Sequence, residues 1–559
     1  MAAPRSDRYH REMVRARDTL VSALVFTALT IAMTWPQAAH LWDRVEGHFD
    51  SYFSMWRLAW IAHQLPMDPA RLFEANVFHP QRNALALSDP ILLQGVCAAP
   101  LAWLGASPVL AYNVLVLASF VLCGLAAWAL AARLTGSSAA GVVAGIVFAF
   151  APYRYEHYFH LEILWGFWIP LGFLALHRAV ESGTVRSGLH AGAILVAQAL
   201  SCLYYAVYLG VTMALAGVLL VRWHDRDRRR VIGGLALGAA AAMAATLLYV
   251  QPLLQVRRDL EPRDASETRS YSATATSYLG TPDGNRLYGR ALGRFGAAEL
   301  RLFPGAAAVL LAAAGAWSWR SKRIALVYLA LLAVAVVGSF GMNAPFFRLG
   351  RGAFDLLSML RVPARFAAVG LCALSVLAAM GTAALLRALG TVQARRVAVA
   401  LVCAAMLAEY STALNLKPVP PAGQVHAWLA SQPRGVVAEL PFPPAGALPG
   451  PEPYRQYFST VHWQPLINGY SGYYPIAYIR LLVQFSVFPR GDWIGLLLGR
   501  GTTYFVLHER EMPAGDLMEA RRRLDAHPGV ALVGRLPDSR DPVWIYRAAP
   551  SARPTAAVP

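Results

Sequence analysis

Apolar runs of membrane-spanning length recur along this chain up to residue 414. A helix needs about 20 apolar residues to cross a bilayer, and helices or closed barrels alone satisfy their backbone polar groups there. Hydrophobic residues make up 57% of the 559 residues and charged residues only 15%. This composition excludes an ordinary soluble globular protein. The sequence therefore predicts an all-α polytopic membrane protein.

Arginine clusters lie between the apolar runs, which gives the predicted helices a direction. Basic residues collect on the cytoplasmic side of membrane proteins. The Arg-rich residues 5–17 therefore predict a cytoplasmic N-terminus. The net charge of +18 is explained by this orientation and by anionic lipids, so we expect membrane lipids as partners and no nucleic acid.

Alternation of basic turns predicts about 11 transmembrane helices, an odd number that places the C-terminus outside. Residues 188–221 have basic residues at both ends, so we divide them into two short helices at residues 201–205. The expected spans are Thr19–Ala38, Val109–Arg133, Ser138–Ala151, Ile163–Val180, the two halves of Gly188–Val221, Val231–Val250, Phe303–Trp319, Ile324–Phe340, Phe366–Leu386 and Val397–Ala413.

The chain changes character after residue 414. Residues 1–414 form the expected transmembrane domain, and residues 415–559 form a small extracytoplasmic α/β domain with alternating strand-like and helix-like runs. The expected outer loops of the transmembrane domain are residues 39–108, 152–162, 251–302 and 341–365. The expected strands are Val436–Leu440, Thr503–Leu507, Val530–Val533 and Val543–Tyr546, and the expected helices are Val425–Ser431, Ile476–Phe485 and Asp516–Ala526.

The first outer loop places one acid, Asp50, among aromatic residues in the stretch His48–Trp60. On a helix Asp50, Phe53 and Arg57 share one face, because residues three and four apart align. A carboxylate at this position either caps a helix in solvent or acts as a general base that takes a proton from an acceptor hydroxyl. The pattern leaves both interpretations open. We also expect Arg57 to bind substrate.

The second outer loop contains His157, His160 and Glu162. Side chains of these types bind a divalent metal, orient a phosphate or hydrogen-bond a sugar. Packing at the headgroup level is the alternative. We expect His157 and His160 to bind substrate. A divalent metal, Mg²⁺ or Mn²⁺, is left open as a cofactor.

Arginines on the predicted outer side form the third group, above all Arg361 and Arg365 in Arg-Val-Pro-Ala-Arg. Guanidinium groups grip phosphate oxygens in pairs, so this spacing suits a lipid phosphate or pyrophosphate. Contact with outer-leaflet headgroups is the alternative. Glu299 is a further outer acid, and we include it among the candidate substrate-binding residues.

The chain resembles the GT-C superfamily of membrane glycosyltransferases. The resemblance rests on the Phe49–Trp56 loop, the His157–Glu162 loop, the Arg361–Phe366 entry to a span and the outer tail. More specifically, the chain is similar to uncharacterised bacterial glycosyltransferase-like proteins, whose tails carry strings like Asn468-Gly-Tyr-Ser-Gly472. It implies a multi-pass enzyme of the bacterial cytoplasmic membrane that uses a polyprenyl-phosphate-linked sugar.

The resemblance implies an inverting hexosyl or pentosyl transfer to a glycan, lipid or protein acceptor, with Asp50 as base. Many members carry a second acid next to the first, where this chain has Ser51. Glu162 is then expected to supply the second catalytic acid. Arg361 and Arg365 would neutralise the phosphate that leaves.

Two other functions remain open from the sequence. A secondary transporter or flippase for lipid-linked sugars would need ionisable residues within the spans and an inverted repeat. The predicted spans are poor in acids and show no repeat. A non-catalytic scaffold for envelope assembly would instead use the C-terminal domain for binding and would not need Asp50.

Overall fold

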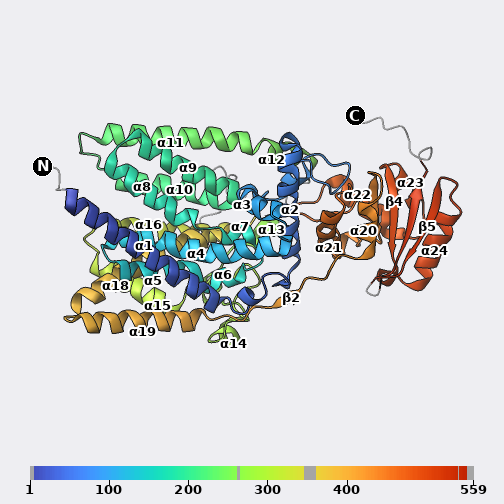
Figure 1. Cartoon of the computed structure of the whole chain (residues 1–559). Coiled ribbons are helices and arrows are strands. Elements are labelled where there is room, and N and C mark those ends of the chain that lie inside the picture. Colours follow the sequence, from blue (N-terminus) through green and yellow to red (C-terminus); the bar gives the residue numbers. More distant parts are fainter. Residues whose placement is uncertain (1–4, 261–264, 345–360, 539–540, 550–559) are drawn as a thin grey trace. The chain divides into compact units, whose positions relative to one another are not determined.

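The computed structural model describes residues 5–260, 265–344, 361–538 and 541–549. The chain divides into two compact units (Figure 1). Unit 1 contains Met1–Glu46, Asn113–Tyr249 and Arg263–Lys417, and unit 2 contains Gly47–Tyr112, Val250–Pro262 and Pro418–Pro559. Most of the predicted outer loop 341–365 lies outside the described residues. The predicted domain boundary at residues 414 and 415 stays a prediction.

Unit 1 contains helices at the predicted spans, although α1 begins at Arg5 rather than Thr19 and the predicted span Ile163–Val180 is divided into two helices. The predicted break in residues 188–221 falls at Cys202, between α9 and α10. The helices are α1 (Arg5–Met33), α4 (Pro108–Thr135), α5 (Ser138–Phe150), α6 (Pro152–Glu156), α7 (Leu161–Leu164), α8 (Trp168–Ser182), α9 (Val185–Ser201), α10 (Leu203–Leu220), α11 (Arg228–Tyr249), α13 (Ala265–Ser270), α14 (Gly289–Leu292), α15 (Ala306–Ser318), α16 (Arg323–Ser339), α18 (Ala367–Ala388) and α19 (Val392–Tyr410).

Within the described residues, six helical segments are long and apolar enough to cross a membrane. The remaining predicted spans are shorter, such as α15 and α16, or less apolar, such as α19, so the count of about 11 stays a prediction. The six segments are Ala16–Met33, Pro108–Thr135, Leu161–Ser182, Leu203–Leu220, Arg228–Tyr249 and Pro363–Ala388.

Two helices of unit 1, α9 and α11, approach each other at facing glycines. Each helix carries glycines four residues apart, Gly188 and Gly192 in α9 and Gly234 and Gly238 in α11. A Cβ atom on Gly192 would lie 2.2 Å from the carbonyl oxygen of Gly238. Small residues at this spacing let helix backbones pack closely inside a membrane. This contact therefore requires glycine.

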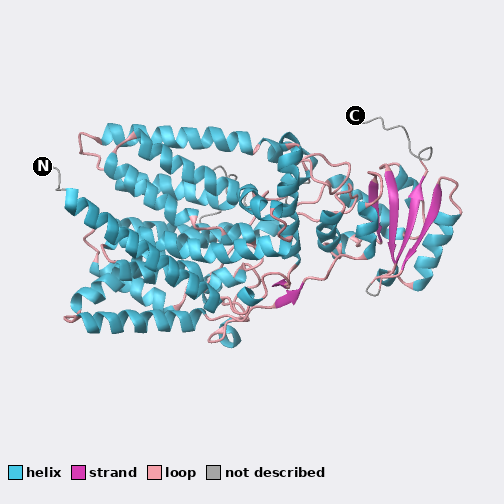
Figure 2. Ribbon diagram, viewed as in Figure 1, coloured by secondary structure: helices cyan, strands magenta, loops and turns pink. Residues whose placement is uncertain are grey.

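Unit 2 contains a four-stranded sheet in the order β3-β4-β6-β5 (Figure 2). Strands β3 and β4 are parallel and the other pairs antiparallel. All four predicted strands and three predicted helices of the tail are present, whereas α21 and α23 were not predicted. The elements are α2 (Phe49–Met67), α3 (Leu92–Trp103), α12 (Gln251–Val256), α20 (Gln424–Ala430), β3 (Val436–Leu440), α21 (Glu452–Phe458), α22 (Ile476–Gln484), α23 (Trp493–Leu498), β4 (Thr502–His508), α24 (Ala514–Asp525), β5 (Val530–Leu536) and β6 (Val543–Ala548).

The core of unit 2 joins the first predicted outer loop to the tail. Phe53, Trp56 and Trp60 of α2 are buried in the same hydrophobic cluster as Tyr504 and Val506 of β4. Burial of large aromatic side chains is the main favourable term in such a core. The helix that carries Asp50 is thus part of the same folded body as the C-terminal sheet.

The glycine contact can be tested with single methyl groups. We expect Gly192→Ala to lower the free energy of unfolding by about 1–3 kcal/mol, because the new Cβ meets a backbone carbonyl that cannot rotate away. Gly233→Ala in α11 is the control, because nothing lies within 4 Å of its Cβ position. The free energy of unfolding of this control variant should be unchanged or slightly higher. Thermal unfolding of the purified chain measures both, and equal behaviour would contradict the close packing.

Candidate functional site

Asp50 lies in the first turn of α2, where the helix dipole favours a negative charge. The backbone N–H of Asp50 donates to Nδ1 of His48, the N-cap residue, at 3.2 Å. The Asp50 side chain is 15% exposed and its Oδ2 lies 3.4 Å from the same His48 nitrogen. Helix α2 begins at Phe49, so Asp50, Phe53 and Arg57 lie on a helix, which is the condition under which the sequence places them on one face.

The carboxylate of Asp50 accepts a hydrogen bond from a residue of the C-terminal segment. The hydroxyl of Tyr470 donates to Asp50 Oδ1 at 2.7 Å. Burial and the neighbouring Asp50 carboxylate raise the pKa of Tyr470 well above its usual value. The phenol therefore stays protonated at neutral pH and remains a donor. Edge-to-face contacts with Phe49 and Phe53 hold its ring, with centroids 5.4 and 5.1 Å away.

Helix α21 fixes the loop that presents Tyr470. The two carboxylate oxygens of Glu452 accept from Nδ2 of Asn468 at 3.0 Å and from the backbone N–H of Gly469 at 2.8 Å. Oε1 of Gln456 accepts from the backbone N–H of Tyr470 at 2.7 Å. Glu452 and Gln456 are fully buried, so these bonds are shielded from water. The hydroxyl of Tyr470 is therefore positioned by a rigid support.

Arg57, predicted to contact substrate, is buried in the structure with 1% exposure. Its guanidinium stacks on Phe53 with 4.2 Å to the ring centroid. It also donates to the carbonyl oxygen of Asp89 at 2.6 Å and to the hydroxyl of Ser54 at 2.9 Å. These contacts tie α2 to the chain that follows it. The substrate-binding role of Arg57 stays a prediction that this geometry does not favour.

In unit 1, the structure brings together Glu299, Arg365, His160 and His157. Both oxygens of Glu299 accept from the guanidinium of Arg365, at 2.7 and 2.9 Å. Nε2 of His160 lies 3.7 Å from Glu299 Oε1, and Nδ1 of His160 lies 3.3 Å from Nδ1 of His157. Two residues of the second predicted outer loop, one of the predicted loop 251–302 and one at a span entrance thus form one cluster.

Within this cluster, Glu299 is ionised and His157 is neutral at neutral pH. Burial alone would raise the pKa of Glu299, but the charges of Arg365 and His160 lower it far below its usual value. Burial lowers the pKa of His157 well below 6.5. Glu299 also has a backbone φ of 72°, a strained conformation for a residue other than glycine. Such strain is found at functional sites more than elsewhere.

Glu162 and Arg361 are arranged differently from what the sequence suggested. Glu162 is buried and close enough to Arg365 to interact with its charge. Arg361 instead pairs with Glu267, at 2.8 Å from Nε to Oε1. Each of the two predicted phosphate-binding arginines therefore has its own glutamate. No sequence pattern pointed to Glu267, because it lies almost a hundred residues before Arg361.

Some members of the unit 1 cluster could hold a metal ion. Ligand atoms of His157, His160 and Glu299 all lie within 4.8 Å of one another, whereas the predicted Glu162 is not in this set. However, Arg365 already neutralises Glu299 through two hydrogen bonds, and a cation would have to displace it. The donor set thus favours an ion pair at this position.

Sequence reasoning missed Glu156, which supports this cluster together with Arg301 of the predicted outer loop 251–302. Oε1 of Glu156 accepts from the backbone N–H of Glu299 at 3.1 Å, and Oε2 lies 3.5 Å from Arg301. Burial raises the pKa of Glu156 to about 7, against the lowering effect of Arg301. Glu156 stands one residue before His157 in the second predicted outer loop, which is the signal that could have identified it.

No protein-family model and no curated protein match this sequence. The structure is similar to the arabinofuranosyltransferase AftD from Mycobacteria, with a TM-score of 0.62 and 15% identity over 95% of this chain. A mutant of AftD gives a TM-score of 0.57 and 15% identity over 96% of the chain. The chain has a GT-C fold.

The GT-C fold implied by the sequence resemblance is thus confirmed. The chain spans 40% and 42% of the two AftD structures. An oligosaccharyltransferase from Archaeoglobus fulgidus overlaps less well, with a TM-score of 0.49 and 13% identity over 97% of this chain and 75% of the other. Within the GT-C fold, the roles of Asp50, Glu162 and the arginines stay predictions.

The two arginine–glutamate pairs of unit 1 differ in burial, so their contributions to stability can be compared. Glu299→Gln leaves the 9% exposed Arg365 without its counter-charge, whereas Glu267→Gln acts on a pair that is 32–37% exposed. Breaking a buried pair costs about 3–5 kcal/mol and an exposed pair about 1 kcal/mol or less. We expect thermal unfolding to show a far larger loss for Glu299→Gln. Equal losses would contradict the buried pair.

Proposed function

We propose that this chain is a membrane glycosyltransferase that moves a sugar from a polyprenyl-phosphate donor to an acceptor hydroxyl. The observation that carries the proposal is the GT-C fold across nearly the whole chain, shared with an arabinofuranosyltransferase. The proposal places the reaction on the outer face of the bacterial cytoplasmic membrane. It keeps both a pentose and a hexose as the transferred sugar.

In this proposal Asp50 is the general base. Its carboxylate takes the proton of the acceptor hydroxyl while that oxygen attacks the anomeric carbon of the donor. The new glycosidic bond forms as the bond between that carbon and the lipid phosphate breaks, so the configuration inverts. The bond electrons stay on the phosphate, which leaves as polyprenyl phosphate.

Tyr470 is the positioning residue for this base. Its hydrogen bond to Oδ1 fixes the rotation of the Asp50 carboxylate, which supports a defined direction for the other oxygen. The same bond favours the ionised form of Asp50, because Tyr470 donates to a negative charge. A base held ionised is ready to accept a proton, although each such hydrogen bond also weakens it.

In the proposal, Arg361 and Arg365 neutralise the negative charge of the leaving phosphate. Arg361 is the more accessible of the two, at 32% side-chain exposure against 9% for Arg365. Because Glu299 already compensates its charge, Arg365 would stabilise the phosphate only as one end of an oriented ion pair. Glu162 and a divalent metal remain proposed participants, with no step that requires the metal.

Asp50→Asn should lower transfer about 100- to 10,000-fold, because the amide cannot accept the proton. The assay uses proteoliposomes of the full chain with polyprenyl-phosphate arabinofuranose and a polyprenyl-phosphate hexose in parallel, and it detects the new glycosidic bond. Asp68→Asn, at the other end of α2 and exposed, is the matched control. Undiminished transfer by a folded Asp50→Asn variant would show that Asp50 is not the base. Movement of the donor across the membrane without formation of a glycosidic bond would support a flippase.

Tyr470→Phe removes the donor to Asp50 while the aromatic ring is kept. Loss of a hydrogen bond to the charged form raises the pKa of a carboxyl group. The acidic limb of the pH profile of kcat/KM should therefore move to higher pH. Tyr454→Phe is the control, since its ring packs on Tyr52 in the same unit. An unchanged acidic limb in an active Tyr470→Phe variant would argue against the positioning role.

A further inference from the structure

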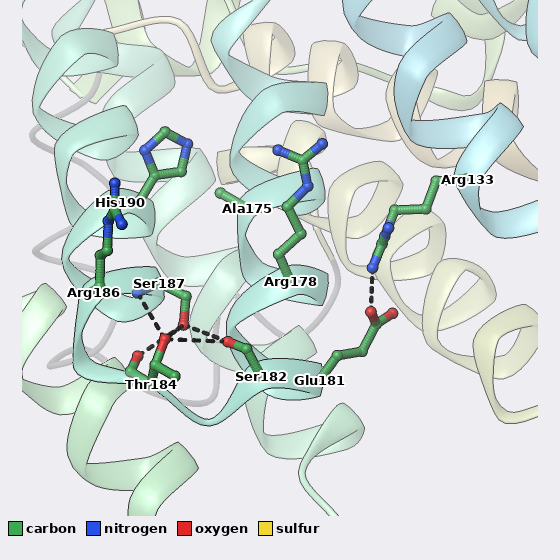
Figure 3. Close-up of a pocket in the computed structure, with 9 residues that line it drawn as sticks. All are labelled: Arg133, Ala175, Arg178, Glu181, Ser182, Thr184, Arg186, Ser187 and His190. Atoms are coloured by element: carbon green, nitrogen blue, oxygen red, sulfur yellow. Dashed lines mark hydrogen bonds and ion pairs between the residues drawn. The ribbon is translucent and has the colours of Figure 1, made fainter. Parts of the chain in front are cut away.

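A cavity of about 570 Å³ lies where α4, α8 and α9 end or begin, around the turn between α8 and α9 (Figure 3). All of its lining belongs to unit 1. The side chains around it are basic or hydroxylated for the most part. They are Arg133, Arg178, Glu181, Ser182, Thr184, Arg186, Ser187 and His190, with Ala175 as the apolar member.

The cavity carries an excess of positive charge. Three arginines face one acid, and Arg133 already pairs with that acid, Glu181. Among the described residues, no hydrogen bond or ion pair reaches the guanidinium of Arg178 or Arg186. Figure 3 shows none between them and the other residues that line the cavity. Guanidinium groups that line one hollow repel each other unless an anion lies between them.

Three other arginines near this end of unit 1 have partners within the protein. Arg228 donates to the carbonyl oxygen of Trp223 at 2.9 Å, and Arg323 donates to that of Val221 at 2.9 Å. Arg230 lies 3.8 Å from the carboxylate of Asp227. The combination of a hollow with two unpartnered guanidiniums therefore distinguishes Arg178 and Arg186.

The start of α9 also favours the binding of an anion in this cavity. The hydroxyl of Thr184 caps the helix by accepting from the backbone N–H of Ser187 at 3.3 Å. The hydroxyls of Ser182 and Ser187 lie 2.7 Å apart in the same lining. A helix of 17 residues carries a partial positive charge at its N-terminus, and this charge favours an anion.

We propose that this cavity binds a phosphate group through Arg178 and Arg186. Guanidinium groups match phosphate oxygens in geometry and charge better than other basic groups do. Helix α8 belongs to the membrane-crossing segment Leu161–Ser182, so the cavity lies where such a segment ends. Phospholipid phosphates lie at that depth of a bilayer. A lipid headgroup and a soluble phosphate ester share this chemistry, and the site is independent of the proposed transferase reaction.

The test measures binding of two probes to the full chain. The first probe is phosphatidylglycerol in nanodiscs that otherwise contain phosphatidylcholine, with retained lipid counted by native mass spectrometry. The second is inorganic pyrophosphate added to the detergent-purified chain, with binding measured by calorimetry. The variants are Arg178→Gln with Arg186→Gln. Arg226→Gln is the matched control, because Arg226 is also exposed and basic but does not line the cavity.

We expect the double variant to bind about 25-fold more weakly, which is about fivefold for each arginine. The Arg226→Gln control should bind as the unmodified chain does. If only the binding of phosphatidylglycerol depends on the two arginines, the site binds a lipid headgroup. If the binding of pyrophosphate depends on them, the site binds soluble phosphates.

Equal binding by the double variant and the control, for both probes, overturns the proposal. The variants Arg178→Lys and Arg186→Lys guard against a folding defect, because they keep the charge but lose the paired donors. Binding between that of the unmodified chain and that of the glutamine variants is the expected result. Thermal unfolding of each variant without probe shows whether the fold is intact.

Discussion

The burial of one face of α2 determines where the candidate base lies. Phe53, Trp56 and Trp60 are each 5% exposed or less, and they share a hydrophobic cluster with the sheet of the C-terminal segment. Side chains of this size contribute more to a core than any single polar contact nearby. Because the aromatic face is fixed in that core, the first turn of the same helix brings Asp50 to Tyr470. The position of Asp50 is thus set by apolar packing, and its orientation by a hydrogen bond.

In each unit, a buried charge is compensated by a specific partner of opposite charge. In unit 1 Glu299 pairs with Arg365, and in unit 2 Glu439 accepts from His508 at 2.9 Å. Burial would lower the pKa of His508, but its bonds to Asp541 and Glu439 raise it to about 9. An ion taken from water without a partner costs several kcal/mol, so each pair fixes the segments that carry it. These pairs give the chain a defined arrangement of loops.

Local elements could be predicted well from the sequence because hydrophobic periodicity is a local signal. The strand expected at Val436–Leu440 has those same ends, and the break at Cys202 follows from charges on both sides of residues 188–221. Helix α21 was missed, since Pro449, Pro451 and Pro453 around its start are turn signals. Pro at the first positions of a helix is nevertheless compatible with helical geometry.

Long-range pairings could not be predicted in the same way. Asp50 and Tyr470 are 420 residues apart, and no periodicity links them. The sequence placed Glu299 and Arg365 on the same side of the membrane, but it could not show that they pair with each other. It also grouped Arg361 with Arg365 by spacing, whereas the structure gives each a different glutamate. Contacts of this kind depend on tertiary packing alone.

The arginines of the predicted outer loops conflict with a simple count of positive charges, and three of them are paired with acids. A charge held against an acid contributes little to the net field of a loop, whereas an unpaired charge contributes fully. Arg178 and Arg186, near the end of α8 that the sequence predicts to be cytoplasmic, have no such acid among the described residues. The charges of these two arginines are therefore consistent with the predicted orientation. The paired outer arginines are Arg301 with Asp283, Arg361 with Glu267 and Arg365 with Glu299.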